Sequence, residues 1–159
     1  MAKFNQMIVT NVGRLQYAKA MAGKRIVITK VVFGSGSPAS QSAASELTSL
    51  VRAEITGTIE GVDTTSLEGV AIVTANVNNA SLESPLSIKE IGVFCKDPDT
   101  SEEVMYAYCY SPNDIDVIPS SGSGTVVWKI RVQLAITNAV GEETPAQQYN
   151  SFFKLKMCV

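Results

Sequence analysis

The stretch IKEIGVFCKDPDTSEEVMYAYCY, residues 88–110, is the part of the chain that decides the fold. Two runs rich in β-branched and aromatic residues flank the acidic segment DPDT at residues 97–100, a pattern typical of two strands joined by a turn. Pro98 has the backbone angle required at the second position of a tight turn, and Asp97 suits the first position. The stretch therefore predicts a β-hairpin within a larger sheet.

The hairpin contains two of the three cysteines of the chain, which raises the question of a disulfide. A turn centred on DPDT places Cys95 opposite Val104 and Cys109 opposite about Glu90. The two cysteines are then about five positions apart along the sheet, at about 3.3 Å per residue, well beyond the roughly 7 Å over which a disulfide can form. With Cys158 the cysteine number is odd, which favours reduced thiols in a reducing compartment.

Outside the hairpin, the sequence pattern predicts one helix and several further strands. Before the hairpin, apolar residues at three- and four-residue spacing indicate a helix within residues 10–24, at Val12, Leu15, Ala18 and Ala22. Segments rich in β-branched residues or alternating in polarity indicate strands at residues 25–34, 51–61, 69–78 and 125–137. We therefore expect an α+β fold, mainly antiparallel β, with one N-terminal helix and a sheet or sandwich of about six strands.

Composition excludes several classes of function. The chain has 159 residues, is 45% apolar and 18% charged, and carries a net charge of -2 with a pI of about 5.2, so no basic footprint for nucleic acid is expected. No apolar run approaches the roughly 18 residues of a membrane span, and no secretion signal is recognised, which predicts folding in a cytoplasm. The absence of histidine excludes Ser-His-Asp triads and His-ligated zinc.

The remaining candidates for chemistry each have a structural alternative. Glu90 beside Lys89 is a candidate acid or base, but a carboxylate paired across the sheet or within a trimer contact is the favoured interpretation. Three alternating tyrosines form a candidate glycan face: Tyr106, Tyr108 and Tyr110. Tyrosines in such alternation are also typical of a packing face. The acidic turns lack the central glycine and distal glutamate of a calcium loop, and the GSGS segment lacks the remainder of a phosphate loop. We predict no catalytic residue, no metal and no cofactor.

Several segments, in a fixed order, resemble the phage tail-collar fibre family. VTNVGRLQYAKAMAGK resembles the opening helix of that family, with its T-x-x-G start, and ITKVVFGSGSP resembles the strand that runs into its Gly-rich loop. ELTSLVRAEI resembles the segment leading into the second strand. IKEIGVFCKDPDTSEEVMYAYCYSP, followed by IPSSGSGTVVWKIRVQLAITNA, is the most specific part. The resemblance covers roughly residues 7–140.

The resemblance implies a structural virion protein, not an enzyme. It implies a tail-fibre or baseplate component that attaches a fibre to the baseplate of a contractile tail, folded in the bacterial host cytoplasm and located in the virion tail. The implied partners are two further copies in a homotrimer, baseplate proteins, and a distal fibre or receptor-binding protein. The sequence departs from the family pattern because it stops at Val159, which leaves two expectations: a short stand-alone adaptor, or an attachment domain from which the rest of a fibre is missing.

Residues 1–140 are expected to form the attachment domain, and residues 141–159 a linker with an apolar end. Phe152, Phe153 and Leu155 in that end are candidate partner contacts, with a strand folded back within the chain as the alternative. Two other classes of function remain open: a carbohydrate-binding module that recognises a host receptor, and a hydrolytic tail component, for which the sequence offers no convincing carboxylate pair.

Overall fold

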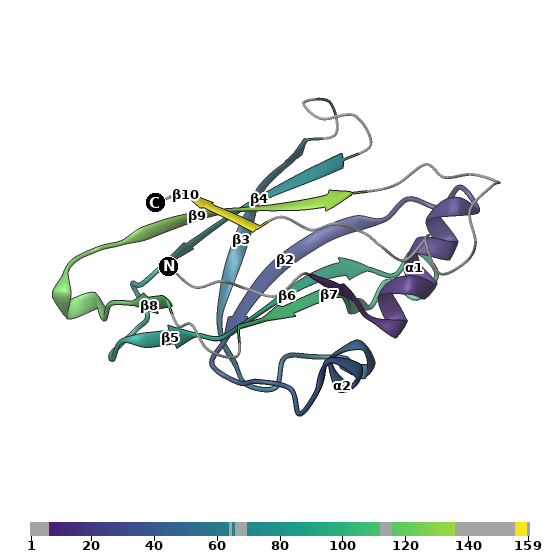
Figure 1. Cartoon of the computed structure of the whole chain (residues 1–159). Coiled ribbons are helices and arrows are strands. Elements are labelled where there is room, and N and C mark those ends of the chain that lie inside the picture. The colour runs from purple at the N-terminus through teal and green to yellow at the C-terminus, as the bar shows by residue number, and fades with distance from the viewer. Residues whose placement is uncertain (1–6, 64, 66–69, 112–115, 136–154, 159) are drawn as a thin grey trace.

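The computed structural model describes residues 7–63, 65, 70–111, 116–135 and 155–158. These residues form a mainly antiparallel β fold with two α-helices, α1 (Asn11–Met21) and α2 (Gln41–Glu46), and one 3-10 turn, η1 (Ser121–Ser123) (Figure 1). The expectation of a mainly antiparallel β fold is therefore confirmed. The described chain has ten strands where about six were expected, because four strands of two to four residues are too short to show a periodicity.

Eight strands form one sheet in the order β1-β7-β6-β2-β3-β4-β9-β10, and every neighbouring pair is antiparallel. Its members are β1 (Ile8–Val9), β2 (Val27–Gly34), β3 (Ala53–Asp63), β4 (Val70–Asn78), β6 (Glu90–Lys96), β7 (Glu103–Tyr110), β9 (Val127–Ala135) and β10 (Leu155–Cys158). A second, two-stranded sheet consists of β5 (Leu86–Ile88) and β8 (Asp116–Ile118).

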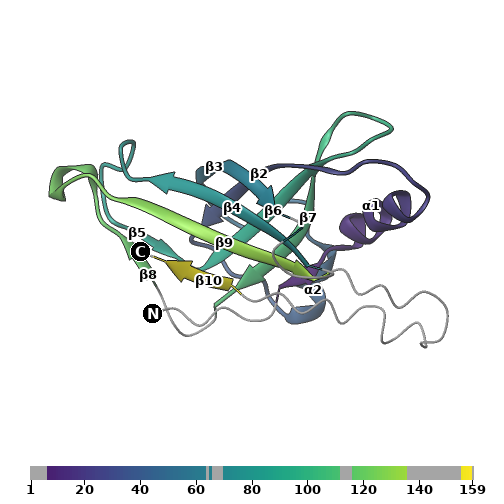
Figure 2. The same cartoon turned by 90° about the horizontal axis from the view of Figure 1, so that it is seen from above.

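The large sheet curls, so that β4 and β9 lie across from β6 and β7 (Figure 2). The main core fills the inner face of this curl. It combines residues from both halves of the sheet, including Val31, Phe33, Val73, Ile91 and Ile130, all of which are buried. Alternation along the strands explains this arrangement, because every second side chain of an antiparallel strand points to the same face.

A smaller core lies on the outer face of β2, β6 and β7. Here α2 and the segment that follows it cover the sheet, and Ala44 and Leu50 pack with Val32, Met105 and Tyr108. Ser40 caps α2 by accepting a hydrogen bond from the backbone N–H of Ala43. The long β2–β3 connection is thus held against the sheet by apolar contacts and, as described below, by Glu90.

Candidate functional site

Glu90, the first residue of β6, lies at the centre of a group of buried hydrogen bonds. Its side chain is fully buried. Its Oε1 accepts hydrogen bonds from the backbone N–H groups of Gly36 at 3.1 Å and Arg52 at 2.7 Å. Its Oε2 accepts from the backbone N–H of Val51 at 3.0 Å and from the hydroxyl of Tyr108 at 2.6 Å. We call this group of five residues the Glu90 brace.

The brace joins both ends of the β2–β3 connection to the β6–β7 hairpin. A buried carboxylate is costly unless its oxygens are satisfied, and here four donors, three of them backbone N–H groups, surround it. A general acid or base must reach a substrate proton directly or through one water. Because Glu90 is fully enclosed by its donors, the geometry agrees with the structural interpretation of this residue.

Glycines in the GSGS segment make this approach possible. A Cβ at Gly34 would lie 2.3 Å from the carbonyl oxygen of Arg52 and 2.6 Å from Oε1 of Glu90. A Cβ at Gly36 would lie 2.7 Å from the same Oε1. Such distances are far inside van der Waals contact, so the Gly-rich segment serves the close packing of its backbone around Glu90.

The three tyrosines proposed as a glycan face do not share one face, and this expectation needs correction. A bulge in the β6–β7 pairing, between Val93 and Phe94, adds Tyr106 as an extra residue in β7. Tyr106 consequently packs against the main core, whereas Tyr108 and Tyr110 pack with the smaller core on the other face. Tyr108 is buried, and its ring stacks on that of Tyr110 with centroids 6.1 Å apart.

Tyr106 and Tyr108 are kept protonated at neutral pH. Burial raises the pKa of Tyr108 far above its usual range, and the hydrogen bond to Glu90 raises it further. Burial likewise raises the pKa of Tyr106 to about 12. A ring that is enclosed on both sides and a hydroxyl committed to Glu90 leave Tyr108 no surface on which a sugar ring can stack.

A second group of contacts fixes the start of α1 to β7. Thr10 caps the helix by accepting a hydrogen bond from the backbone N–H of Gly13 at 2.9 Å, while its own hydroxyl donates to the carbonyl oxygen of Met105 at 2.6 Å. A Cβ at Gly13 would lie 2.0 Å from the carbonyl oxygen of Tyr106. The T-x-x-G start thus provides both the cap and the close approach of helix and strand.

The acidic turn binds the same buried side of α1 further along the helix. Asp97 accepts hydrogen bonds from Nζ of Lys19 at 2.8 Å and from Nε2 of Gln16 at 2.8 Å. Lys19 also pairs with Asp99 at 3.0 Å, and Lys24 forms an ion pair with Asp99. The Lys19 ammonium is the main cause that lowers the pKa of Asp97 well below its usual range. These aspartates therefore act as internal partners of the helix.

Asn79 organises the loop between β8 and β9. This buried side chain donates through Nδ2 to the carbonyl oxygens of Pro119, Ser120 and Gly124 at 2.7–3.2 Å. Its Oδ1 accepts from the backbone N–H of Val126 at 2.9 Å. The Ser-Gly-rich loop is consequently tied to the end of β4, and Gly124 supplies a positive φ of 118° within it.

Cys95 and Cys109 are free thiols. Cys95 pairs with Val104, the register expected from the turn, and Cys109 pairs with Ile91, one position from the expected partner because of the bulge. Both are buried and unbridged. Burial raises the pKa of Cys95 to about 11 and that of Cys109 to about 12, so both remain protonated at neutral pH.

Of the three candidate partner contacts at the C-terminal end, only Leu155 lies among the described residues. Leu155 lies in β10, which pairs with β9 of the same chain through Leu155↔Val132. Leu155 therefore lies in a strand that folds back within the chain, which was the alternative to a partner contact. Phe152 and Phe153 lie outside the described residues, as does the linker that precedes them.

Sequence patterns predicted the hairpin and marked Glu90 and the T-x-x-G start at Thr10, but they missed other polar residues that hold the fold. Gln16 and Asn79 are buried, although neither stands out in the sequence as a core residue. The one available signal was proximity to glycine, at Gly13 and in the loop at 122–124. In the described part of the chain, no group of three or more acidic or cysteine side chains is placed to hold a metal ion.

Comparison of the chain with protein-family models, with curated proteins and with solved structures found no match. Among the described residues, no helix has the length and apolar character needed to cross a bilayer.

Proposed function

We propose that this chain is a structural component of a phage or phage-like tail, and that it attaches a fibre to the tail baseplate. The proposal rests on the resemblance to the tail-collar fibre family. It is supported by one observation: the motif residues that carry the resemblance are also the residues that form the buried polar braces. Glu90 of the Glu-Ile-Gly motif binds the Gly-rich segment at Gly36 and the return strand at Tyr108.

The T-x-x-G start supports the same proposal. Thr10 and Gly13 dock α1 on β7, which is the Tyr-Ala-Tyr return strand. Three segments that are far apart in the sequence but occur in the order of the family are therefore physically joined in this fold. Such a set of contacts is expected of residues that specify a shared fold, because a half-satisfied buried network is destabilising.

The chemistry of the braces favours a mechanical role. The carboxylates of Glu90 and Asp97 and the amide of Asn79 each hold backbone or side-chain groups of loops and helices in place. An attachment domain transmits load between partners and needs loops that keep their shape on assembly, which buried hydrogen bonds provide. Under this proposal the partners are baseplate proteins on one side and a distal fibre or receptor-binding protein on the other, in a homotrimeric assembly in the virion tail.

The described residues do not favour the carbohydrate-binding alternative. That alternative needs a ring face open to a sugar, and Tyr108, the central tyrosine of the proposed face, is buried. Tyr106 packs towards the opposite side of the sheet.

The experiment that tests the proposal compares tail particles made with the natural chain, without it, and with Glu90→Gln. Particles from the bacterial lysate are purified by density gradient, the chain is quantified by mass spectrometry, and baseplates are imaged by electron microscopy. We expect the natural chain at a fixed ratio to other tail proteins, and baseplates without fibres when it is deleted. The proposal is wrong if fibre-bearing particles lack the chain.

Glu54→Gln is the matched control for that experiment. Glu54 is partly exposed and pairs on the surface with Arg52 at 2.8 Å and Ser35 at 2.7 Å, so its substitution leaves the brace intact. We expect particles with Glu54→Gln to carry normal fibres. Equal loss of fibres with both variants would mean that assembly responds to surface charge, and not to the integrity of the Glu90 brace.

A further inference from the structure

The β2–β3 connection, residues 35–52, is a long segment that contributes few side chains to the interior. Its buried side chains are Ala44 and Leu50, and most of its other residues are exposed. Figure 1 shows α2 and its flanking segments below β6 and β7, outside the sheet. A segment with few buried apolar contacts opens at a lower free energy than the strands of a core. The connection is therefore able to open locally while the sheet stays paired.

Buried hydrogen bonds hold the connection to the rest of the fold at its two ends. Gly36 near the start, and Val51 and Arg52 at the end, donate their backbone N–H groups to one acceptor, the carboxylate of Glu90. The hydrogen bonds of α2, in contrast, lie within the connection itself. One carboxylate thus closes both ends of the segment, so that loss of its hydrogen bonds frees both ends together.

The connection covers an apolar area on the outer face of β6 and β7. Leu50 and Met105 lie together over Gly92, where an added Cβ would be 2.5 Å from Cδ1 of Leu50 and 2.9 Å from Sδ of Met105. Met105 is buried, and with Tyr108 it packs against Ala44 and Leu50 in the smaller core. The β6–β7 and β2–β6 pairings use no residue of the connection. Its release therefore uncovers Met105 and leaves these strands paired.

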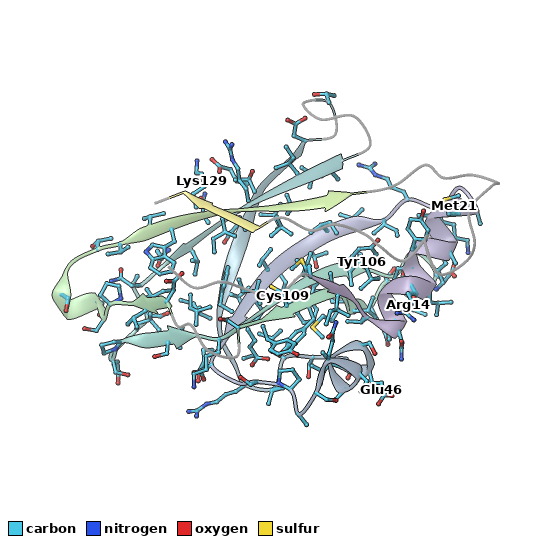
Figure 3. All side chains as sticks on the ribbon, viewed as in Figure 1. Arg14, Met21, Glu46, Tyr106, Cys109 and Lys129 are labelled. Carbon is cyan, nitrogen blue, oxygen red and sulfur yellow. The ribbon has the colours of Figure 1, made fainter. Side chains whose placement is uncertain are left out.

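The two cysteines of the hairpin lie on the inner face of the sheet. Cys109 belongs to the main core, and Cys95 pairs with Ile28, which packs against that core. Figure 3 shows Cys109 within the sheet and Glu46 on α2, outside it. The reactivity of Cys95 and Cys109 therefore reports opening of the sheet, whereas a thiol at position 105 would report release of the connection.

We propose that the β2–β3 connection opens as one unit while the eight-stranded sheet stays paired, and that the Glu90 carboxylate is the group that keeps it closed. The open form presents Val32, Phe94 and Met105, which the smaller core covers in the closed form. The connection thereby controls access to an apolar area of the sheet. The inference stands on the contacts and burial of these residues. It does not depend on the proposed attachment to a baseplate, because it concerns the chain by itself.

A thiol placed under the connection tests this opening. Met105→Cys is made in the Cys158→Ser background, and the reaction of the three thiols with an aromatic disulfide reagent is followed by peptide mass spectrometry. Each rate is divided by the rate of the same thiol in urea, which corrects for its own reactivity. We expect position 105 to be at least about tenfold less protected than Cys95 and Cys109. Equal protection of the three thiols overturns the proposal, because position 105 would then be exposed only when the sheet opens.

Two further substitutions in that background separate the two kinds of opening. Glu90→Gln removes an acceptor that holds the ends of the connection, so position 105 should react at least about tenfold faster. Val73 is buried in the main core, which stays packed when only the connection opens. Val73→Ala should therefore speed the reaction of Cys109 at least about fivefold and change that of position 105 less than about twofold. Equal acceleration of both positions by Val73→Ala contradicts a separate opening.

Glu54→Gln is the matched control for Glu90→Gln. Glu54 also contacts both ends of the connection, at Ser35 and Arg52, but it does so at the surface, where such pairs contribute little to stability. We expect the reaction at position 105 to stay within about twofold of its rate with the natural Glu54. If Glu54→Gln speeds this reaction as much as Glu90→Gln does, the Glu90 carboxylate is not the group that closes the connection.

Hydrogen exchange of the natural chain tests the same opening without the Met105→Cys substitution. The backbone amides of Gly36, Ala44 and Val51 lie at the start, in the middle and at the end of the connection. If the segment opens as one unit, these amides share one protection factor, which we expect to be at least about tenfold lower than that of the paired amides of β6. Different protection at the two ends, or protection equal to that of β6, overturns the proposal.

Discussion

The hydroxyl of Tyr108 donates a 2.6 Å hydrogen bond to Oε2 of Glu90, and both side chains are fully buried. The bond joins β7 to the first residue of β6, and through Glu90 it reaches the β2–β3 connection. In a low-dielectric interior a hydrogen bond to a charged acceptor is stronger than one in water, and losing its donor is correspondingly costly.

Tyr108→Phe removes the donor and keeps the ring. We expect it to lower the free energy of unfolding by about 1.5–3 kcal/mol, the range for a hydrogen bond to a charged group, measured by urea denaturation. Tyr110→Phe makes the same chemical change in the neighbouring stacked ring, which is only partly buried, and is expected to change stability by less than about 0.5 kcal/mol. Equal losses in the two variants would contradict a special role for the Tyr108 hydroxyl.

Glu90→Gln keeps the size of the side chain but exchanges one acceptor oxygen for an NH₂ group. Whichever way the amide is oriented, at least one backbone N–H in the brace then faces a donor. We expect a loss of about 3 kcal/mol or more, because buried groups are left unpaired. Native-state hydrogen exchange should show faster exchange at the amides of Gly36, Val51 and Arg52. If those amides keep their protection, the brace does not depend on the carboxylate.

Gly13→Ala reverses the usual effect of this substitution in a helix. Alanine ordinarily stabilises a helix by about 1 kcal/mol relative to glycine. Here the added Cβ would lie 2.0 Å from the carbonyl oxygen of Tyr106, so we expect destabilisation by at least about 2 kcal/mol and a lower midpoint in thermal unfolding. Gly61→Ala, where nothing lies within 4 Å of the new Cβ, serves as the control. A stabilised Gly13→Ala variant would show that α1 does not approach β7 this closely.

The hairpin was the most predictable part of the fold. Its turn chemistry fixed the pairing of Cys95 with Val104. The alternation along residues 125–137 agrees with the structure, in which Ile130 and Val132 are buried and Lys129 is exposed. The bulge at Tyr106 could not be predicted, since a single extra residue leaves no mark on composition or periodicity. It is the reason that Tyr106 and Tyr108 lie on opposite faces.

The environment of each element was less predictable than its type. The apolar spacing of residues 12–22 is typical of a helix, but it does not reveal that Gln16 is buried and Leu15 exposed. That inversion depends on Asp97, which lies 81 positions away in the chain and accepts a hydrogen bond from Gln16. The Glu90 brace likewise joins residues 36, 51–52, 90 and 108, and no local pattern reports such a contact.

Stability should fall in acid because of the Asp97 contacts. Lys19, and then hydrogen bonds from the Asp99 backbone and Gln16, lower the pKa of Asp97 below its ordinary value of 3.8. A carboxyl group whose pKa is lower in the folded state contributes stability above its unfolded pKa, and this contribution is lost as the pH falls through the folded value. We therefore expect the free energy of unfolding to decline below about pH 4. Asp99 acts in the same direction through Lys24.

Asp97→Asn tests the origin of that decline. The variant should be less stable than the natural chain at pH 7 and should lose less stability between pH 5 and pH 3. Urea denaturation at each pH provides the measurement. Glu102→Gln, at an exposed residue of the same turn, is the control and should leave the acid dependence unchanged. Parallel pH profiles for Asp97→Asn and the natural chain would assign the acid lability to other carboxyl groups.

The buried thiols give the last prediction. Cys95 and Cys109 have pKa values raised to about 11 and about 12, chiefly by burial, and a thiol reacts with disulfide reagents as its thiolate. In a Cys158→Ser background, which leaves only these two cysteines, we expect almost no reaction with an aromatic disulfide reagent at pH 8 in the folded protein. Two thiols should react rapidly in urea. The thiols become accessible only when the sheet opens. If opening equilibrates faster than the reagent reacts, Tyr108→Phe should increase the reaction rate in proportion to its loss of stability. Rapid reaction of the stable folded chain would mean that the β6–β7 hairpin opens by itself, and that the Glu90 brace does not hold it closed.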